Sequence, residues 1–86
     1  MATKDIPKLR VKIFSPYQIY YEGEAVSISA VNKTGPFDVL SGHANFFSLL
    51  SSGKVNIDTG FQKLDFQLDR GIIKVSSNVV TLFANV

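Results

Sequence analysis

The chain has 86 residues, a formal net charge of +2 and no cysteine. This length fits one domain, the lack of cysteine excludes disulfides and thiolate metal sites, and the small net charge does not indicate nucleic-acid binding. No run of apolar residues is long enough to predict a membrane span, and the polar segment Met1–Asp5 predicts no signal peptide.

The first part of the chain has the period of two that is typical of half-buried strands. A polar lead-in over residues 1–8 precedes three expected strands, at Leu9–Ile13, Gln18–Tyr21 and Glu24–Val31. We expect Ser15-Pro16 and Glu22-Gly23 to turn the chain between these strands. The composition of Asn32–Gly35 indicates a loop after the third strand.

The segment Gly35–Ala44 is expected to hold a short strand between two turns. Gly35-Pro36 would open it, because glycine adopts unusual φ values and proline fixes φ at about −65°. The strand itself would be Phe37–Leu40, and Ser41-Gly42 would end it. The only histidine, His43, then lies at the rim of the sheet, and the residues that follow it are mostly apolar.

The second part of the chain continues the same alternation of strands and turns. Further strands are expected at Asn45–Leu50, Val55–Ile57, Leu64–Leu68, Ile73–Val75 and Val79–Ala84. Turns are expected at Ser51–Gly53, Asp58–Gly60, Asp69–Gly71 and Ser76–Asn78. No segment has a helical period, so residues 9–86 predict an all-β domain, a small sandwich or barrel of about nine or ten short strands.

Two of these strands are apolar on both faces, Asn45–Leu50 and Val79–Phe83. A strand of an isolated sandwich usually has one face in the core and one in water. Either neighbouring loops cover the second apolar face, or it forms an exposed patch that another protein covers. The sequence leaves both alternatives open.

No set of residues predicts covalent chemistry. A single histidine without cysteine cannot form a His/Cys metal cluster, and no glycine-rich phosphate loop occurs. Asp65 and Asp69 could be paired carboxylates, but Asp65 lies on the polar side of an alternating strand, which favours a solvated face. We therefore expect no enzyme activity, no metal and no cofactor, and His43 is either a turn residue bonded to nearby backbone or a partner contact.

The aromatic residues leave a second function open. Tyr17, Tyr20 and Tyr21 are close in sequence, and aromatic clusters on sheets can stack bases or sugars. With Arg10 and Lys12 they could serve a free-standing β-sandwich or barrel that binds oligonucleotide or sugar. Packing in the core or at a sheet edge is the simpler interpretation, because no basic patch surrounds the tyrosines.

The segment Gly35–Ala44 resembles a motif of one protein family, the epsilon subunit of F-type ATP synthase, which is called delta in mitochondria. The family motif reads G-x-F-G-[IV]-L-x-G-H-A. Other segments resemble the family in the same order and at similar spacing: Pro16 with Tyr21–Ala25, Leu50–Ile57, Arg70–Val75 and Asn78–Ala84. The resemblance covers most of the chain and implies the sandwich rather than the barrel, as the N-terminal domain of that family.

The resemblance implies a rotor subunit of the central stalk, which couples the gamma subunit to the membrane ring of c subunits in a proton-translocating ATP synthase. Such a subunit is non-catalytic, binds no nucleic acid and reaches the membrane only through its partners. It lies on the cytoplasmic face of a bacterial plasma membrane, or on the matrix or stroma side in an organelle.

The resemblance also implies which residues meet each partner. Positions on or near the gamma side are matched by Ser15, Phe46, Ser48, Leu50 and Lys54. We expect at least one large apolar residue of this set, Phe46 or Leu50, to be exposed in the isolated chain. The polar loops of the c ring are expected to meet Asn32, Lys33, Thr34, Gly35, Pro36 and His43.

Two departures from the family pattern change these expectations. The family usually has an acidic residue or two before Phe37, where this chain has Asn32–Pro36, so an ion pair with the ring would change sign or vanish. The family also continues into a C-terminal domain of two helices, which inhibits ATP hydrolysis and in some members binds ATP. This chain ends at Val86, so we expect neither property in it.

Overall fold

The structure is a computed structural model that describes residues 8–85. Within these residues the chain forms nine strands and no helix, and it contains no helix that is long and apolar enough to span a membrane. The strands are β1 Leu9–Phe14, β2 Ile19–Ala25, β3 Ser27–Asn32, β4 Gly35–Leu40, β5 Phe46–Leu50, β6 Gly53–Asp58, β7 Lys63–Leu68, β8 Gly71–Ser76 and β9 Val79–Ala84. The prediction of an all-β sandwich is confirmed. Apart from Lys8, the expected lead-in lies outside the described residues.

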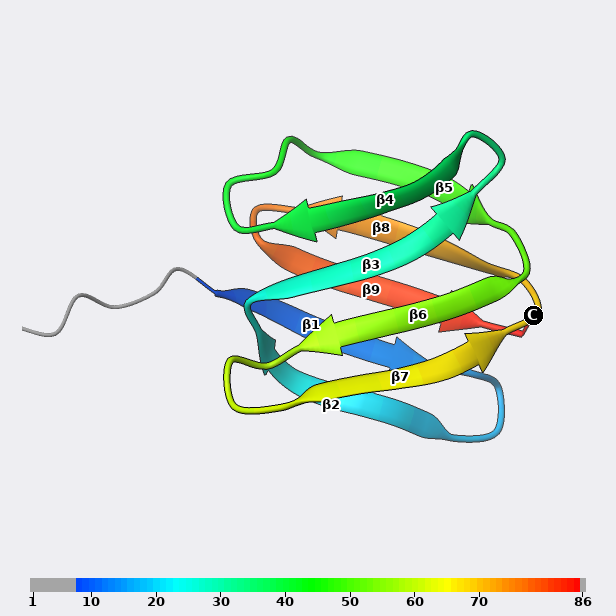
Figure 1. Cartoon of the computed structure of the whole chain (residues 1–86), viewed down its shortest axis with the longest axis horizontal. Helices are drawn as coiled ribbons and strands as arrows, with labels where there is room; N and C mark the ends of the chain where they lie inside the picture. Colours follow the sequence, from blue (N-terminus) through cyan, green and yellow to red (C-terminus); the bar gives the residue numbers. More distant parts are fainter. Residues whose placement is uncertain (1–7, 86) are drawn as a thin grey trace, which may run out of the picture.

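The strands form two layers, which Figure 1 shows one behind the other. Sheet A has five strands in the order β2-β1-β9-β8-β5, and sheet B has four in the order β4-β3-β6-β7. Within sheet A the first strand, β1, pairs in parallel with the last, β9. All other neighbouring strands are antiparallel.

The core lies between the sheets and is built from alternate residues of each strand. Leu9, Val11 and Ile13 of β1 point inward and are fully buried, as the period of two predicts. Their main buried neighbours from the other strands are Ile28, Val39, Val55, Ile57, Leu68, Ile73, Val75, Val80 and Leu82. Burial of each such side chain contributes about 1.5–3 kcal/mol, and a close-packed core of this kind resists deformation.

Aromatic side chains close the two open sides of the sandwich. On one side Phe37 of β4 lies 5.4 Å from Phe46 of β5, measured between ring centroids. On the other side Tyr20 of β2 stacks on Phe66 of β7 at 5.3 Å. Each pair joins an edge strand of sheet A to an edge strand of sheet B.

The prediction that Gly35-Pro36 opens a strand by a turn is wrong. Asn32 pairs with Gly35 across β3 and β4, so only Lys33 and Thr34 lie between the strands, and Gly35 and Pro36 are already part of β4. Proline is tolerated here because β4 is an edge strand, where its missing N–H interrupts no second ladder. The expected polar loop is therefore a tight two-residue hairpin.

The predicted turn at Glu22-Gly23 is also wrong. β2 runs through both residues, and Gly23 pairs with Val11 of β1. The chain instead leaves sheet A at Val26 and enters sheet B, so the expected strand Glu24–Val31 is divided between two sheets. The glycine leaves room for the side chain of Tyr21, because a Cβ at Gly23 would lie 3.2 Å from the hydroxyl of Tyr21.

The turns after β4 and between β8 and β9 match their predictions. Gly42 has a φ of +84°, a left-handed conformation that glycine adopts without strain. Ser77 and Asn78 join β8 to β9 with φ values of +50° and +64°. The side-chain oxygen of Asn78 also accepts a hydrogen bond of 2.8 Å from the amide of Gly42, so the two turns support each other.

Candidate partner-binding surface

The outer face of sheet B is polar. Cross-strand pairing places Asp38, Ser29, Asn56 and Asp65 in one row across its four strands. The hydroxyl of Ser29 donates a hydrogen bond of 2.5 Å to Asp38. No group of three or more potential metal ligands occurs within residues 8–85. This face offers charged and hydroxyl groups to water, and the exposed Asp65 lies there as its strand pattern predicts.

The outer face of sheet A has a different chemistry, because an apolar row crosses all five strands. The pairing register aligns these residues in the order Ile19, Phe14, Phe83, Ile72 and Leu49. We call these five residues the apolar row. Its ends are open to solvent, with Ile19 55% and Leu49 67% exposed. At its centre the rings of Phe14 and Phe83 stack with centroids 5.0 Å apart.

The dimensions of the apolar row suit a protein contact. Four strand spacings of about 4.8 Å make it about 19 Å long. A hollow of about 380 Å³ lies at the β5 end of the row, lined by Leu49, Leu50, Arg70, Gly71 and Ile72. Phe47, 64% exposed, extends the apolar surface along β5. Contiguous exposed apolar surface of this kind marks interaction sites on soluble proteins.

A second row of residues runs beside the apolar row and carries positive charge. The register aligns Glu22, Lys12, Thr81, Lys74 and Phe47 across the same five strands. Lys12 and Lys74 are both exposed. Among residues 8–85, neither lysine forms an ion pair with a carboxylate. The middle of the face therefore combines apolar side chains with exposed lysines that form no ion pair within residues 8–85.

The register of β5 determines which of its residues are exposed. Phe46, Ser48 and Leu50 point inward, and Leu50 is only 4% exposed, whereas Phe47 and Leu49 point outward. The expectation that Phe46 or Leu50 is solvent-exposed is therefore wrong. Since the strand is apolar on both faces, its composition does not decide which face is buried, and a shift of one residue exchanges the two.

The other two residues of that set lie elsewhere. Ser15 is buried in the turn after β1, where its hydroxyl accepts hydrogen bonds from the amides of Tyr17 at 3.2 Å and Gln18 at 3.3 Å. Lys54 is exposed on the outer face of sheet B, opposite Gln67. The five residues expected against gamma thus do not share one surface.

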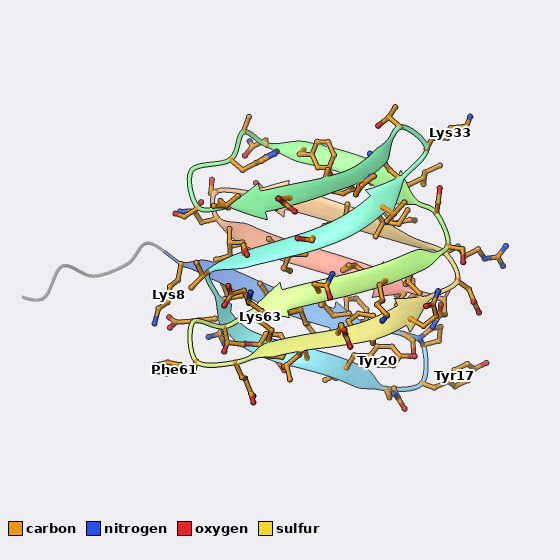
Figure 2. The ribbon with its side chains drawn as sticks, in the orientation of Figure 1. Lys8, Tyr17, Tyr20, Lys33, Phe61 and Lys63 are labelled. Carbon is orange, nitrogen blue, oxygen red and sulfur yellow. The ribbon has the colours of Figure 1, made fainter. Side chains whose placement is uncertain are left out.

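The residues expected against the c ring divide between the two ends of β4. Figure 2 shows Lys33 at the tip of the β3–β4 hairpin, at one end of the sandwich. The side-chain oxygen of Asn32 accepts a hydrogen bond of 2.9 Å from the amide of Thr34, and its nitrogen donates one of 3.2 Å to Ser48. Asn32 and Ser48 are therefore half-buried and bond to each other between β3 and β5. Lys33, Thr34 and Pro36 remain exposed at this end. Gly35, between Thr34 and Pro36, has a φ of +120°.

His43 lies beyond the other end of β4 and makes local contacts. Its amide donates a hydrogen bond of 3.1 Å to the carbonyl of Leu40, and its Nδ1 lies 2.7 Å from the carbonyl oxygen of Ala44. Its ring packs edge-on against Phe46 with a centroid distance of 5.5 Å. These are the contacts of a turn histidine, one of the two alternatives, and they leave the ring half-buried. His43 and the hairpin thus lie beyond opposite ends of the edge strand β4.

The three tyrosines do not form a stacking platform. Tyr17 is almost fully exposed in the turn between β1 and β2, whereas Tyr20 is stacked on Phe66 (Figure 2). Tyr21 points toward the core side, and its hydroxyl donates a hydrogen bond to the carbonyl of Glu24. This arrangement gives no support to a site for bases or sugars.

Comparisons with known proteins agree on one family. The family model for the β-sandwich domain of the ATP synthase delta/epsilon chain matches residues 8–86. The ATP synthase epsilon chain of Chlorobium limicola is 32% identical over 83 residues, which cover 95% of this chain and 93% of the relative. That of Chlorobaculum tepidum is 35% identical with the same coverage. That of Leptospira borgpetersenii is 31% identical over 78 residues, and the match spans 61% of its length.

Solved structures share the fold. A chain in the structure of the Euglena gracilis mitochondrial ATP synthase (OSCP/F1/c-ring) matches with a TM-score of 0.84 and 18% identity, covering 96% of this chain and 54% of that one. A chain in the structure of the central stalk and c-ring of the Tetrahymena thermophila mitochondrial ATP synthase matches with a TM-score of 0.77 and 16% identity, covering 99% of this chain and 67% of that one. The chain therefore spans about half to two thirds of these two subunits.

Proposed function

Because the chain belongs to the β-sandwich family of ATP synthase delta and epsilon chains, we propose that it is a rotor subunit in the central stalk of a proton-translocating F-type ATP synthase. It couples the gamma subunit to the c ring and performs no covalent chemistry itself. Its partners hold it at the cytoplasmic face of a bacterial plasma membrane, or at the equivalent face in an organelle. Transmission of torque requires a stiff body, and a buried core with two aromatic seams provides one.

The apolar row is the observation that carries this proposal. An isolated sandwich has no use for five large apolar side chains in register on an outer face, whereas the core of a protein interface does. We assign gamma as the occupant of this face. Leu49 and Phe47 then make the contacts that the resemblance implied for their sequence neighbours Leu50 and Phe46, which point inward.

The c ring is assigned to the free edge of β4. Lys33, Thr34 and Pro36 approach it from one end of the strand and His43 from the other, while Asn32 and Gly35 shape the hairpin. A lysine at this hairpin replaces the acid usual in the family. The contact therefore works without carboxylate pairing from this loop.

Binding to purified gamma tests the assignment of the docking face. We expect Leu49→Asp to weaken binding at least about tenfold, because it removes an apolar contact and places a carboxylate without a partner against the covered surface. The matched control is Asn56→Asp, which adds the same charge to the exposed outer face of sheet B. Both variants should melt within a few degrees of the unmodified chain. Equal affinity of the two variants for gamma would contradict the assignment.

The same preparation tests the other candidate function. A labelled single-stranded oligonucleotide should not bind measurably at moderate salt. Binding that falls steeply as salt rises would instead support the oligonucleotide module.

A further inference from the structure

We propose that Lys12 and Lys74 determine partner specificity, by pairing with two carboxylates that lie beside an apolar ridge on the docking surface of gamma. The inference rests on the proposed function, since it takes gamma to be the occupant of the apolar row. It adds a chemical requirement on the partner that the apolar contact alone does not impose.

The two lysines are placed symmetrically about β9. Thr81 of β9 pairs with Lys12 of β1 on one side and with Lys74 of β8 on the other. The lysines are therefore two strand spacings apart, about 10 Å. Each is two residues from a member of the apolar row in its own strand, Lys12 from Phe14 and Lys74 from Ile72. A partner seated on the row must pass directly beside both ammonium groups.

Within residues 8–85, no carboxylate lies within ion-pair distance of either lysine. Glu22 stands opposite Lys12 in the register, yet the Nζ of Lys12 lies 5.2 Å from the centroid of the Phe14 ring, toward the apolar row. Glu24 forms an ion pair of 3.7 Å with Lys8 at the β2 edge. Within residues 8–85, no ion pair reaches either Lys12 or Lys74.

This distribution selects the chemistry of the partner. A neutral or basic surface that covered the row would remove water from the lysines and return no hydrogen bonds or opposite charge. Two carboxylates about 10 Å apart would neutralise both. On the outer face of sheet B, Asp38 and Asp65 lie in the central row beside the exposed Lys54 and Lys63, so an acidic partner would meet carboxylates there and is directed to sheet A.

Charge complementarity across an interface speeds association, and this effect falls as the salt concentration rises. The test therefore measures association and dissociation rates of the unmodified chain and its variants with purified gamma, at low and at high salt. We expect Lys12→Glu and Lys74→Glu each to slow association about threefold or more at low salt, and the double variant about tenfold. The effect on association should shrink at high salt, and dissociation should also become faster, because each reversal leaves a carboxylate of the partner without its cation.

Lys63→Glu is the matched control, because Lys63 is an exposed lysine of sheet B and its reversal changes the net charge by the same amount. We expect it to alter association less than twofold. If Lys63→Glu slows association as much as Lys74→Glu does, net charge alone is responsible and the inference is overturned. Unchanged rates for Lys12→Glu and Lys74→Glu would overturn it as well.

Leu49→Asp separates this inference from the proposed docking face. If Leu49→Asp weakens binding and the lysine variants do not, the docking face stands and the specificity role of the lysines is wrong. If gamma binds the unmodified chain and neither Leu49→Asp nor the lysine variants have an effect, the docking face itself is wrong. Melting temperatures of all variants confirm that each is folded.

Discussion

Leu49 and Leu50 are adjacent leucines in one strand, and they have opposite environments. Leu49 is 67% exposed at the end of the apolar row, whereas Leu50 is 4% exposed and packs in the core. The difference follows from the period of two in a strand, which sends neighbouring side chains to opposite faces. Position in the register, more than residue type, therefore decides what each leucine does.

Truncation of these two leucines should have very different effects on stability. We expect Leu50→Ala to lower the free energy of unfolding by about 2–5 kcal/mol, because it leaves a cavity in a packed core. In a domain of this size that corresponds to a fall in melting temperature of at least about 10 °C. Leu49→Ala should shift it by no more than a few degrees. Thermal unfolding followed by circular dichroism measures both, and equal losses would mean that the register of β5 is different.

The sequence allows some of these residue roles to be predicted. In β1, charged residues alternate with apolar ones, so the buried positions of Leu9, Val11 and Ile13 could be read directly. In β5 the only polar residue is Ser48, and it points inward, where it bonds to Asn32. No local pattern signals that bond, because Asn32 belongs to another sheet.

At the scale of elements, strands could be predicted more reliably than the turns that divide them. Gly-containing dipeptides turn a chain only where strand pairing stops, and pairing depends on residues far away in sequence. Gly23 stays within β2 because Val11 of β1 pairs with it. Gly35 stays within β4 because Asn32 pairs with it, which reduces the expected loop to Lys33 and Thr34.

The edge of β4 makes a prediction about the c ring. If this edge faces the ring, cysteines placed by Thr34→Cys and His43→Cys should both cross-link to c subunits in the assembled complex, although they lie at opposite ends of the strand. Lys33→Glu should disturb docking on the same ring, because it reverses the charge at the hairpin tip. Efficient cross-links from both cysteines to gamma, and from neither to c subunits, would show that a different edge faces the membrane.

At the scale of the whole molecule, the sandwich has two outer faces of different character. In both sheets, alternate residues of each strand point into the core and the others point outward. The outward residues are polar in the central row of sheet B and apolar in the apolar row of sheet A. The apolar row could not be predicted, since it requires the parallel pairing of β1 with β9 and the register of five strands at once. The resemblance of short motifs to a family indicated the class of partner, while only the fold defines the surface that the partner can use.

Thiol protection in the assembled ATP synthase tests the central claim most directly, because the chain has no cysteine of its own. Leu49→Cys places a thiol on the outer face of sheet A, and Asn56→Cys places one on the outer face of sheet B; both positions are exposed in the isolated chain. Both thiols should react rapidly with a maleimide in the free subunit. In the complex we expect Leu49→Cys to be protected and Asn56→Cys to remain reactive. Protection of Asn56→Cys with continued reactivity of Leu49→Cys would contradict the account.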